Sequence, residues 1–233
     1  MSDQMNPGNM NTAADSGALE LPAGCLFDFD GVIVDSFAMN VEAWRQSFED
    51  VFGRAMPELP PEELTGRSAR RIAHELAVLG NDPQRAEEIF SRKEDLLNGG
   101  DLLPPLRPGV HAVIAWCREH GIPFGVGSNA PGEYIRETLT GHGLEIPVVL
   151  GFDEVAKPKP APDLYIECAR KADIPAADFG RVLVFEDSPP GVTAAAEAGM
   201  YPVGILAHIK AENLLHCGAR EIHDDLAAWL ETR

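Results

Sequence analysis

Apolar side chains recur along this chain with two different periods. Residues 37–53 carry large apolar side chains at the three- and four-residue spacing of a helix with one buried face. Two more segments, around residues 72–79 and 86–97, repeat this spacing, and a turn-forming GNDP sequence separates them. No segment between residues 37 and 103 has the pattern of a strand. The pattern predicts a block of helices in this part of the chain.

The rest of the chain alternates short apolar runs with amphipathic segments. We expect strands near residues 25–31, 122–128, 147–152, 181–187 and 201–206. We expect helices near residues 110–120, from 131 onwards, at 162–171, at 192–198 and over the segment that ends in AAWL. Strands that alternate with helices are typical of a parallel sheet covered on both faces. The predicted fold class is α/β, a Rossmann-like parallel sheet with an α-helical cap inserted after its first strand.

These changes of pattern also predict where the chain divides. Residues 1–19 are polar and contain no apolar run, so we expect a disordered N-terminal tail. The sequence LLPPLRPG at residues 102–109 has the composition of a linker or hinge. We therefore expect residues 20–36 and 105–233 to form the sheet domain and residues 37–104 to form the cap.

The charge balance excludes one class of partner. The chain has 19 Lys and Arg residues against 37 Asp and Glu residues, which gives a formal net charge of −18. Nucleic-acid binding depends on basic side chains that neutralise phosphates, so we expect no nucleic-acid partner. The apolar runs are far shorter than the roughly 20 residues that cross a bilayer, so we expect no membrane partner.

The cysteines and the N-terminal residues indicate the cellular compartment in which we expect the protein. The N-terminal segment has no basic region followed by an apolar run, as a secretory signal would. The four cysteines are widely spaced, with no CxxC pair and no histidine at zinc-binding distance. We interpret the cysteines as reduced packing residues and expect a cytoplasmic protein that is a monomer or a weak homodimer.

Polar side chains follow three of the expected strands directly. They are Asp28 and Asp30 after the first strand, Ser128 and Asn129 after the strand at 122–128, and Glu186 and Asp187 after the strand at 181–187. A loop lysine, Lys157 or Lys159, precedes the helix near residue 162. Ligands of open parallel sheets bind beyond the carboxyl ends of the strands, so these side chains are expected to meet at one edge. Carboxylates crowded together raise one another's pKa unless a cation lies among them, and oxygen ligands favour Mg²⁺.

Each of these residues could also have an ordinary structural role. Asp30 and Gly31 form a common turn dipeptide. Ser128 and Ser188 are residues that cap helix N-termini, and a loop lysine such as Lys159 normally stays in solvent. Independent coincidences at every strand end are much less probable than one shared site, and this favours the functional interpretation.

Four segments resemble the motifs of a known family. In order along the chain they are DFDGVIVDS at residues 28–36, VGSNA at 126–130, KPAPDLY at 159–165 and VFEDSPPGVTAAAEAGM at 184–200. Together they resemble the four motifs of the haloacid dehalogenase superfamily, over about residues 24–206. The helical insertion is similar to the C1-type cap of that family, and the nearest resemblance is to the beta-phosphoglucomutase-like phosphatases.

The resemblance implies a reaction and a role for each motif residue. It implies a Mg²⁺-dependent phosphatase that hydrolyses a small phosphorylated metabolite, such as a sugar phosphate, through an aspartyl-phosphate intermediate. It implies Asp28 as nucleophile, Asp30 as general acid and base, Ser128 and Lys159 as phosphate-binding residues, Asn129 as a substrate-binding residue, and Asp28, Asp30, Glu186 and Asp187 as the residues around Mg²⁺.

The predicted cap contains candidate substrate-binding residues. The basic sequence TGRSARR holds Arg67, Arg70 and Arg71, and either Arg67 or Arg70 is a candidate to grip a second polar part of the substrate. The alternative is a solvated helix face stabilised by nearby glutamates. Lys93 matches a cap lysine of beta-phosphoglucomutase and is a further candidate.

Three other functions are weighed against a phosphatase. Isomerisation of a sugar phosphate is the first alternative, although Ala69 and Asn40 stand where the mutase has an arginine and a histidine. The second is an NAD-binding oxidoreductase, because Gly125, Gly127 and Ala130 spell a short GxGxxA pattern. That pattern leaves the acidic residues at the other strand ends without a purpose. The third is a non-catalytic binding protein, which the complete set of motif residues disfavours.

Overall fold

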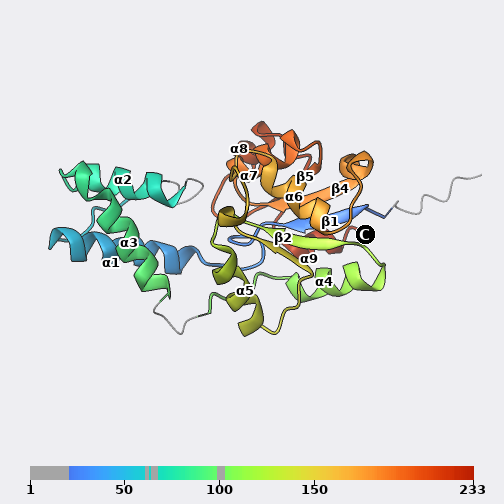
Figure 1. Ribbon diagram of the computed structural model, residues 1–233, viewed down its shortest axis with the longest axis horizontal. Helices are drawn as coiled ribbons and strands as arrows, with labels where there is room; N and C mark the ends of the chain where they lie inside the picture. The colour runs from blue at the N-terminus through green and yellow to red at the C-terminus, as the bar shows by residue number, and fades with distance from the viewer. Residues whose placement is uncertain (1–20, 61–62, 64–67, 99–102) are drawn as a thin grey trace, which may run out of the picture.

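A six-stranded parallel sheet forms the centre of the larger part of the molecule (Figure 1). The computed structural model describes residues 21–60, 63, 68–98 and 103–233. The strands are β1 (Gly24–Phe27), β2 (Phe124–Gly127), β3 (Val148–Leu150), β4 (Val182–Glu186), β5 (Tyr201–Ile205) and β6 (Glu221–His223). Their order across the sheet is β3-β2-β1-β4-β5-β6, and all pairs are parallel. The predicted α/β class with a parallel sheet is confirmed.

The strand order reverses at β1, and this positions the polar residues. The chain moves outward to β2 and β3 on one side of β1 and to β4, β5 and β6 on the other. Such a reversal opens a crevice beyond the carboxyl ends of the central strands. In the register, Phe27 at the end of β1 lies opposite Val126 of β2 and Phe185 of β4. The residues that follow these three strands therefore emerge beside one another.

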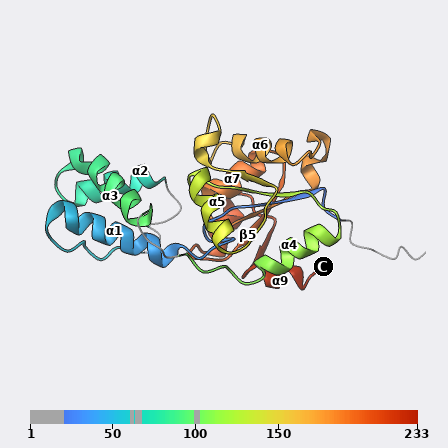
Figure 2. The same ribbon diagram turned by 60° about the horizontal axis from the view of Figure 1, so that its bottom comes forward.

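Helices cover both faces of the sheet. The helices of this part are α4 (Val110–Glu119), α5 (Gly132–Gly141), α6 (Asp163–Lys171), α7 (Pro189–Glu197), α8 (Ala211–His216) and α9 (Leu226–Leu230), with short 3₁₀ turns at Phe152–Glu154 and Ala176–Arg181. Helices α4, α5 and α9 bury apolar side chains in one core with Phe27 and Phe185. Helices α6 and α7 bury theirs in another core with Leu26 and Val184, which lie on the opposite face of the sheet. Figure 2 shows α6 and α7 on one side of the strands and α4 and α9 on the other.

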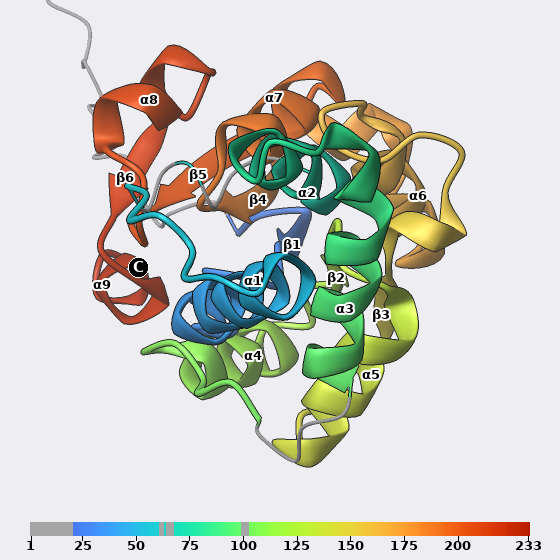
Figure 3. The same cartoon turned by 90° about the vertical axis from the view of Figure 1, so that its left-hand side faces the viewer.

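Three helices form a separate bundle after β1. They are α1 (Phe37–Phe52), α2 (Ala69–Leu79) and α3 (Ala86–Asn98), with a 3₁₀ turn at Pro83–Arg85 between α2 and α3. The bundle has its own hydrophobic cluster, in which Trp44, Phe48, Leu76 and Ile89 are buried. Seen from the bundle side in Figure 3, α1, α2 and α3 lie in front of β1, β2 and β4. We propose on this basis that residues 37–104 are a cap domain and that residues 20–36 and 105–233 are the core domain.

Several details differ from the sequence prediction. Helix α8 and strand β6 were not expected, and both are short. Helix α7 begins at Pro189 instead of residue 192, and the Ser188 side chain caps it by accepting a hydrogen bond from the Gly191 N–H at 3.3 Å. The predicted disordered tail, residues 1–19, lies outside the described residues. In the described part of the chain, no helix combines the length and the apolar character that crossing a membrane requires.

Candidate active site

The acidic residues of the site lie at the carboxyl ends of β1 and β4. Asp28 follows β1 directly, is 6% exposed, and donates its backbone N–H to the Phe185 carbonyl at 2.9 Å. Asp187 follows β4, and its side chain packs against Gly31 in the loop after β1. Gly31 has φ +85°, and a β-carbon there would overlap the Asp187 carboxylate. Glycine at position 31 thus permits both the turn and the close approach of the two chain segments.

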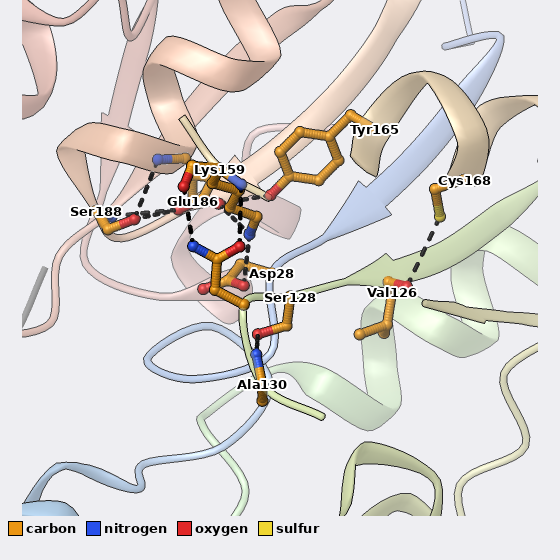
Figure 4. A network of polar contacts seen from close by, with 11 residues as sticks. Asp28, Val126, Ser128, Ala130, Lys159, Tyr165, Cys168, Glu186 and Ser188 are labelled. Carbon is orange, nitrogen blue, oxygen red and sulfur yellow. Dashed lines mark hydrogen bonds and ion pairs between the residues drawn. The ribbon is translucent and has the colours of Figure 1, made fainter. Parts of the chain in front are cut away.

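A buried lysine joins two of the carboxylates. The Lys159 ammonium donates to Asp28 Oδ1 at 2.7 Å and to Glu186 Oε1 at 2.6 Å (Figure 4). Its side chain is 3% exposed, so the ordinary interpretation of a solvated loop lysine is wrong. A buried charge of this kind is tolerated only when it is paired and hydrogen-bonded, as it is here. The structure therefore brings together side chains that lie 131 and 27 residues apart in the sequence.

The Glu186 carboxylate is fully engaged by neighbouring donors. Tyr165 on α6 donates its hydroxyl to Oε1 at 2.5 Å, and the Ser188 hydroxyl donates to Oε2 at 2.9 Å. No part of Glu186 is exposed. Tyr165 was given no role in the sequence analysis, although it lies within the KPAPDLY segment. In the sequence, Tyr165 stands on the apolar face of an expected helix. This position is typical of an ordinary core residue, so it gave no sign of a role in the site.

The residues after β2 hold the lysine loop in position. The Asn129 side-chain amide donates to the Lys159 carbonyl at 3.1 Å, and its oxygen accepts from the Lys159 backbone N–H at 3.0 Å. Ser128 is 2% exposed, and its hydroxyl accepts from the Ala130 N–H at 3.2 Å. Ser128 is not the cap of the next helix, because α5 begins at Gly132. The Asn129 contacts show that this side chain positions the segment that carries Lys159.

Asp30 lies beside the other acids but has a different partner. Its Oδ1 accepts a short hydrogen bond from the hydroxyl of Ser36, the residue that precedes the first cap helix. Burial raises the pKa of Asp30, while this hydrogen bond and the charges of Lys93 and Lys159 lower it. Ser36 is a second residue to which the sequence analysis gave no role. The contact links Asp30 to the point where the chain enters the cap.

The electrostatics of the site reflect an excess of buried negative charge. Burial raises the pKa of Asp28 to about 7, against the opposing effect of Lys159, and the neighbouring Glu186 adds to the rise. Burial also raises the pKa of Asp187 well above its usual value, and the charges of Asp28 and Glu186 add to that rise. One lysine therefore does not balance the acidic side chains.

The same side chains have the donor set of a hard cation site. Carboxylate oxygens of Asp28, Glu186 and Asp187 all lie within 4.8 Å of one another. Among the residues that the structure describes, no hydrogen-bond donor contacts the Asp187 carboxylate or Asp28 Oδ2. Oxygen ligands with uncompensated negative charge suit Mg²⁺, so the residues fit the ion that the sequence predicts. The Asp30 carboxylate is not part of this group of three.

The cap candidates lie in different environments. Arg70 is exposed, pairs with Glu87, and stacks over the Phe90 ring at 4.3 Å, so it ties α2 to α3. Arg71 pairs with Glu75 at 3.0 Å on the same helix. Acidic neighbours in the cap thus already hold both guanidinium groups, which favours the alternative of a solvated helix face over a role of Arg70 in substrate binding. Arg67 lies outside the described residues.

The glycines of the GxGxxA pattern have a packing role. A β-carbon at Gly125 would come within 2.9 Å of Cys168 Sγ and 3.0 Å of Val148, and one at Gly127 would contact Leu164. Gly125 thus lets α6 and β3 pack closely on β2, whereas a β-carbon at Gly127 would make only ordinary van der Waals contacts. A dinucleotide site of this kind also needs an acidic residue about 20 residues further on to bind the ribose. Asp153 lies at about that distance, and its carboxylate accepts a hydrogen bond from the Gly132 N–H at 2.9 Å. This geometry removes the observations that favoured an oxidoreductase.

Comparison with known proteins identifies the family of this chain. The family model for haloacid dehalogenase-like hydrolases matches residues 25–205. The chain belongs to this family, and the resemblance noted in the sequence is confirmed. It is a hydrolase of this family, and the relatives that it resembles include a beta-phosphoglucomutase.

Relatives with named activities include both phosphatases and a mutase. The fructose-1-phosphate phosphatase YqaB of Escherichia coli is 30% identical over 188 residues, which covers 78% of this chain and 96% of that protein. The beta-phosphoglucomutase of Bacillus subtilis is 28% identical over 196 residues, which covers 77% of this chain and 81% of that protein. A solved hydrolase of the family from Entamoeba histolytica superposes with a TM-score of 0.73 at 21% identity, covering 88% of this chain and 93% of that one, and shares the fold.

Proposed function

We propose that this protein is a Mg²⁺-dependent phosphatase that hydrolyses a small phosphorylated metabolite through an aspartyl-phosphate intermediate. The observation that carries the proposal is the buried contact of Lys159 with Asp28 and Glu186, with Asp187 beside them at the reversal point of the sheet. The names of the relatives support a sugar-phosphate-like phosphomonoester as the substrate.

Asp28 is the nucleophile in this proposal. Its Oδ1 is held by Lys159, which leaves Oδ2 without a donor in the described part of the chain. That free oxygen attacks phosphorus, the bond to the alcohol oxygen breaks, and the phosphoryl group is carried on Asp28. Splitting hydrolysis into two displacements lowers the barrier of a reaction that is very slow without catalysis. Lys159 and the Ser128 hydroxyl would hold the non-bridging phosphate oxygens.

A magnesium ion would be held by Asp28 and Asp187, with Glu186 next to them. These are the carboxylates that lie within 4.8 Å of one another, and no donor of the described residues contacts the Asp187 carboxylate. Bound there, the ion would supply positive charge against the phosphate oxygens and keep the neighbouring carboxylates ionised.

Asp30 would move the protons of both steps. It first protonates the departing alcohol and then removes a proton from the water that attacks the phosphoaspartate. Burial raises the pKa of this carboxyl, which favours the protonated form that the first step needs. The Ser36 hydroxyl orients the Asp30 carboxylate through its short hydrogen bond.

Three further residues act by positioning the catalytic groups. Glu186 fixes the Lys159 ammonium, which also contacts Asp28, and Tyr165 in turn fixes Glu186. Asn129 holds the Lys159 backbone through two hydrogen bonds, so we propose it as a positioning residue. Preorganised groups of this kind do not have to reorient as charge develops on the phosphoryl oxygens.

Sugar-phosphate isomerisation is the second candidate. Lys93 supports it, because this cap lysine is 7% exposed and its charge lowers the pKa of Asp30. Orthophosphate release from a panel of sugar phosphates with Mg²⁺, measured beside conversion of beta-glucose 1-phosphate to glucose 6-phosphate, tests both. The proposal expects metal-dependent orthophosphate release as the main reaction. Isomerisation without release would overturn it in favour of the mutase.

A further inference from the structure

The loop after β5 contacts the point where the chain enters the cap. His208 lies in this loop, between the end of β5 at Ile205 and the start of α8 at Ala211. Its imidazole stacks on the Phe37 ring, with the ring centres 3.7 Å apart and the ring planes inclined by 27°. Phe37 is the first residue of α1, and Figure 1 shows that α1 starts beside the core domain and runs away from it. A side chain of the core is therefore packed on the first residue of the cap.

The same imidazole lies beside Asp35. Its Nε2 is 3.7 Å from Asp35 Oδ1, which is too long for a direct hydrogen bond, so the stack on Phe37 is the closer contact. Asp35 Oδ1 also accepts a hydrogen bond from the Phe37 N–H at 3.4 Å. His208 thus lies against both neighbours of Ser36 in the sequence.

The loop that carries His208 is fixed to the core. Leu206 donates its N–H to the His223 carbonyl at 2.8 Å, and its own carbonyl accepts a hydrogen bond from the Arg107 guanidinium at 2.7 Å. Ile209 packs in a hydrophobic cluster with buried side chains of α7 and α8. These contacts hold both sides of His208, so its ring is a firm support for the Phe37 ring.

We propose that His208 is a positioning residue for Asp30 and that it acts through Ser36. The Ser36 side chain is buried, and its hydroxyl donates the short hydrogen bond to Asp30 Oδ1. Because His208 packs on Phe37 and lies beside Asp35, it restrains the backbone that carries this hydroxyl. The inference rests on the proposed function, in which Asp30 moves the protons of both steps.

The place of Ser36 explains why such a restraint would matter. Ser36 directly precedes α1, so a displacement of the start of this helix would also move the Ser36 hydroxyl. Proton transfer depends on the position of the acid, and a small misplacement of a catalytic group lowers the rate strongly. A stacked ring pair favours one arrangement over another by about 5-fold, and this sets the size of the expected effect.

The first test uses the leaving group. The alcohol of a sugar phosphate needs a proton to depart, whereas p-nitrophenolate does not. His208→Ala should therefore lower kcat/KM about 5-fold for the sugar phosphate that the wild type hydrolyses fastest, and should leave kcat/KM for p-nitrophenyl phosphate near the wild-type value. His208→Phe, which keeps a ring on Phe37, should restore most of the loss. His216→Ala, which changes an exposed histidine at the end of α8, is the matched control and should have no effect.

The second test asks whether the effect passes through Ser36. Ser36→Ala removes the hydroxyl that contacts Asp30. In this background, His208→Ala should cause no further loss of kcat/KM for the sugar phosphate, because no hydroxyl remains to be positioned. A role of His208 in stability alone would give the same loss in both backgrounds.

The outcomes separate this inference from the proposed function. Equal losses for the two substrates, equal losses with and without the Ser36 hydroxyl, or full activity of His208→Ala would overturn the inference and leave the phosphatase intact. If the wild type does not hydrolyse p-nitrophenyl phosphate, the comparison in the Ser36→Ala background decides. If His208→Ala does not fold, Phe37→Leu replaces it, because it removes the stack from the other side. Wild-type protein that releases no orthophosphate from the panel of sugar phosphates would overturn the proposed function itself.

Discussion

The roles of some residues in the site could be predicted from the sequence, whereas the roles of others follow only from their packing in the structure. Asp28, Asp187 and Ser128 could be predicted because charged or polar side chains directly after apolar strands are typical of a ligand site at the edge of a parallel sheet. Tyr165 could not, because an aromatic residue on an apolar helix face is typical of a core. The pairing of Arg70 could not be predicted either, because sequence spacing does not show that Glu87, 17 residues away, is its partner.

Removal of the Tyr165 hydroxyl should weaken the protein and its chemistry together. Tyr165→Phe deletes a 2.5 Å hydrogen bond to the fully buried Glu186 carboxylate. A hydrogen bond to a charged group contributes about 1.5–3 kcal/mol, so we expect a loss of this order in the free energy of unfolding. We also expect kcat to fall several-fold, because Lys159 loses a fixed partner. Denaturant unfolding and steady-state kinetics measure the two effects.

The matched control is Tyr201→Phe. The Tyr201 hydroxyl has no hydrogen-bond partner among the described residues, although its ring lies under Arg220. This variant should keep both stability and kcat. Equal losses in the two variants would contradict the role given to Tyr165.

Elements of the fold were predictable where their periodicity was long or strongly apolar. Helix α1, with 16 residues and a buried apolar face, matched its predicted range within one residue. Helix α8 has 6 residues and β6 has 3 half-buried residues, so neither carries enough pattern to stand out. Helix α7 begins three residues before the expected range 192–198, whereas the interpretation of Ser188 as a helix cap is confirmed.

The first turn of α7 also shapes the active site. Gly191 lies against the Glu186 carboxylate, and a β-carbon there would overlap it. Gly191→Ala should therefore displace Glu186 and Lys159, lower kcat by at least about 10-fold, and lower the thermal midpoint by several degrees, roughly the effect of 1–3 kcal/mol in a chain of this size. Activity assays and thermal unfolding test this expectation.

Gly180→Ala is the matched control for this substitution. A β-carbon at Gly180 would meet nothing within 4 Å, so this change should leave activity and midpoint near the wild-type values. Wild-type activity in Gly191→Ala would show that the close packing of α7 on Glu186 does not position the lysine.

At the scale of the whole molecule, an excess of acid is concentrated where the strands end. The whole chain carries a net charge of −18. Within the site, three carboxylates lie close together and one lysine contacts two of them. The topology explains this concentration, because the reversal at β1 gathers the ends of β1, β2 and β4. The sequence predicted the parallel sheet and this edge, whereas the position of the bundle of α1, α2 and α3 in front of β1, β2 and β4 required the structure (Figure 3).

The stabilising effect of Mg²⁺ on the protein should depend on pH. Burial raises the pKa of Asp28 to about 7 and raises that of Asp187 as well, so the metal-free folded state binds more protons than the unfolded state. The free energy of unfolding of the metal-free protein should therefore fall as pH rises from about 4, near the unfolded value, to about 7. Mg²⁺ competes with those protons, so its stabilising effect should grow over the same range.

Thermal unfolding in chelator and in excess Mg²⁺, at pH 5 and pH 7.5 and constant ionic strength, measures this difference. The Asp187→Asn variant, which loses one of the raised carboxyls, should show a smaller Mg²⁺ effect at pH 7.5. A Mg²⁺ effect of equal size at both pH values would contradict the assignment of these carboxylates to the metal.

The central claim is that Asp28 takes the phosphoryl group from the substrate. Its most direct test uses the Asp30→Asn variant, in which the phosphoaspartate should accumulate because the base that activates water is absent. The protein is mixed with p-nitrophenyl phosphate and Mg²⁺, quenched in acid, and digested for mass spectrometry. The leaving group of this substrate needs no proton, so the first step does not depend on Asp30. We predict the added mass of one phosphoryl group on the peptide that contains residue 28, and its loss in an Asp28→Asn, Asp30→Asn double variant. A phosphoryl group on a different residue, or p-nitrophenol formed with no phosphorylated peptide, would contradict the account.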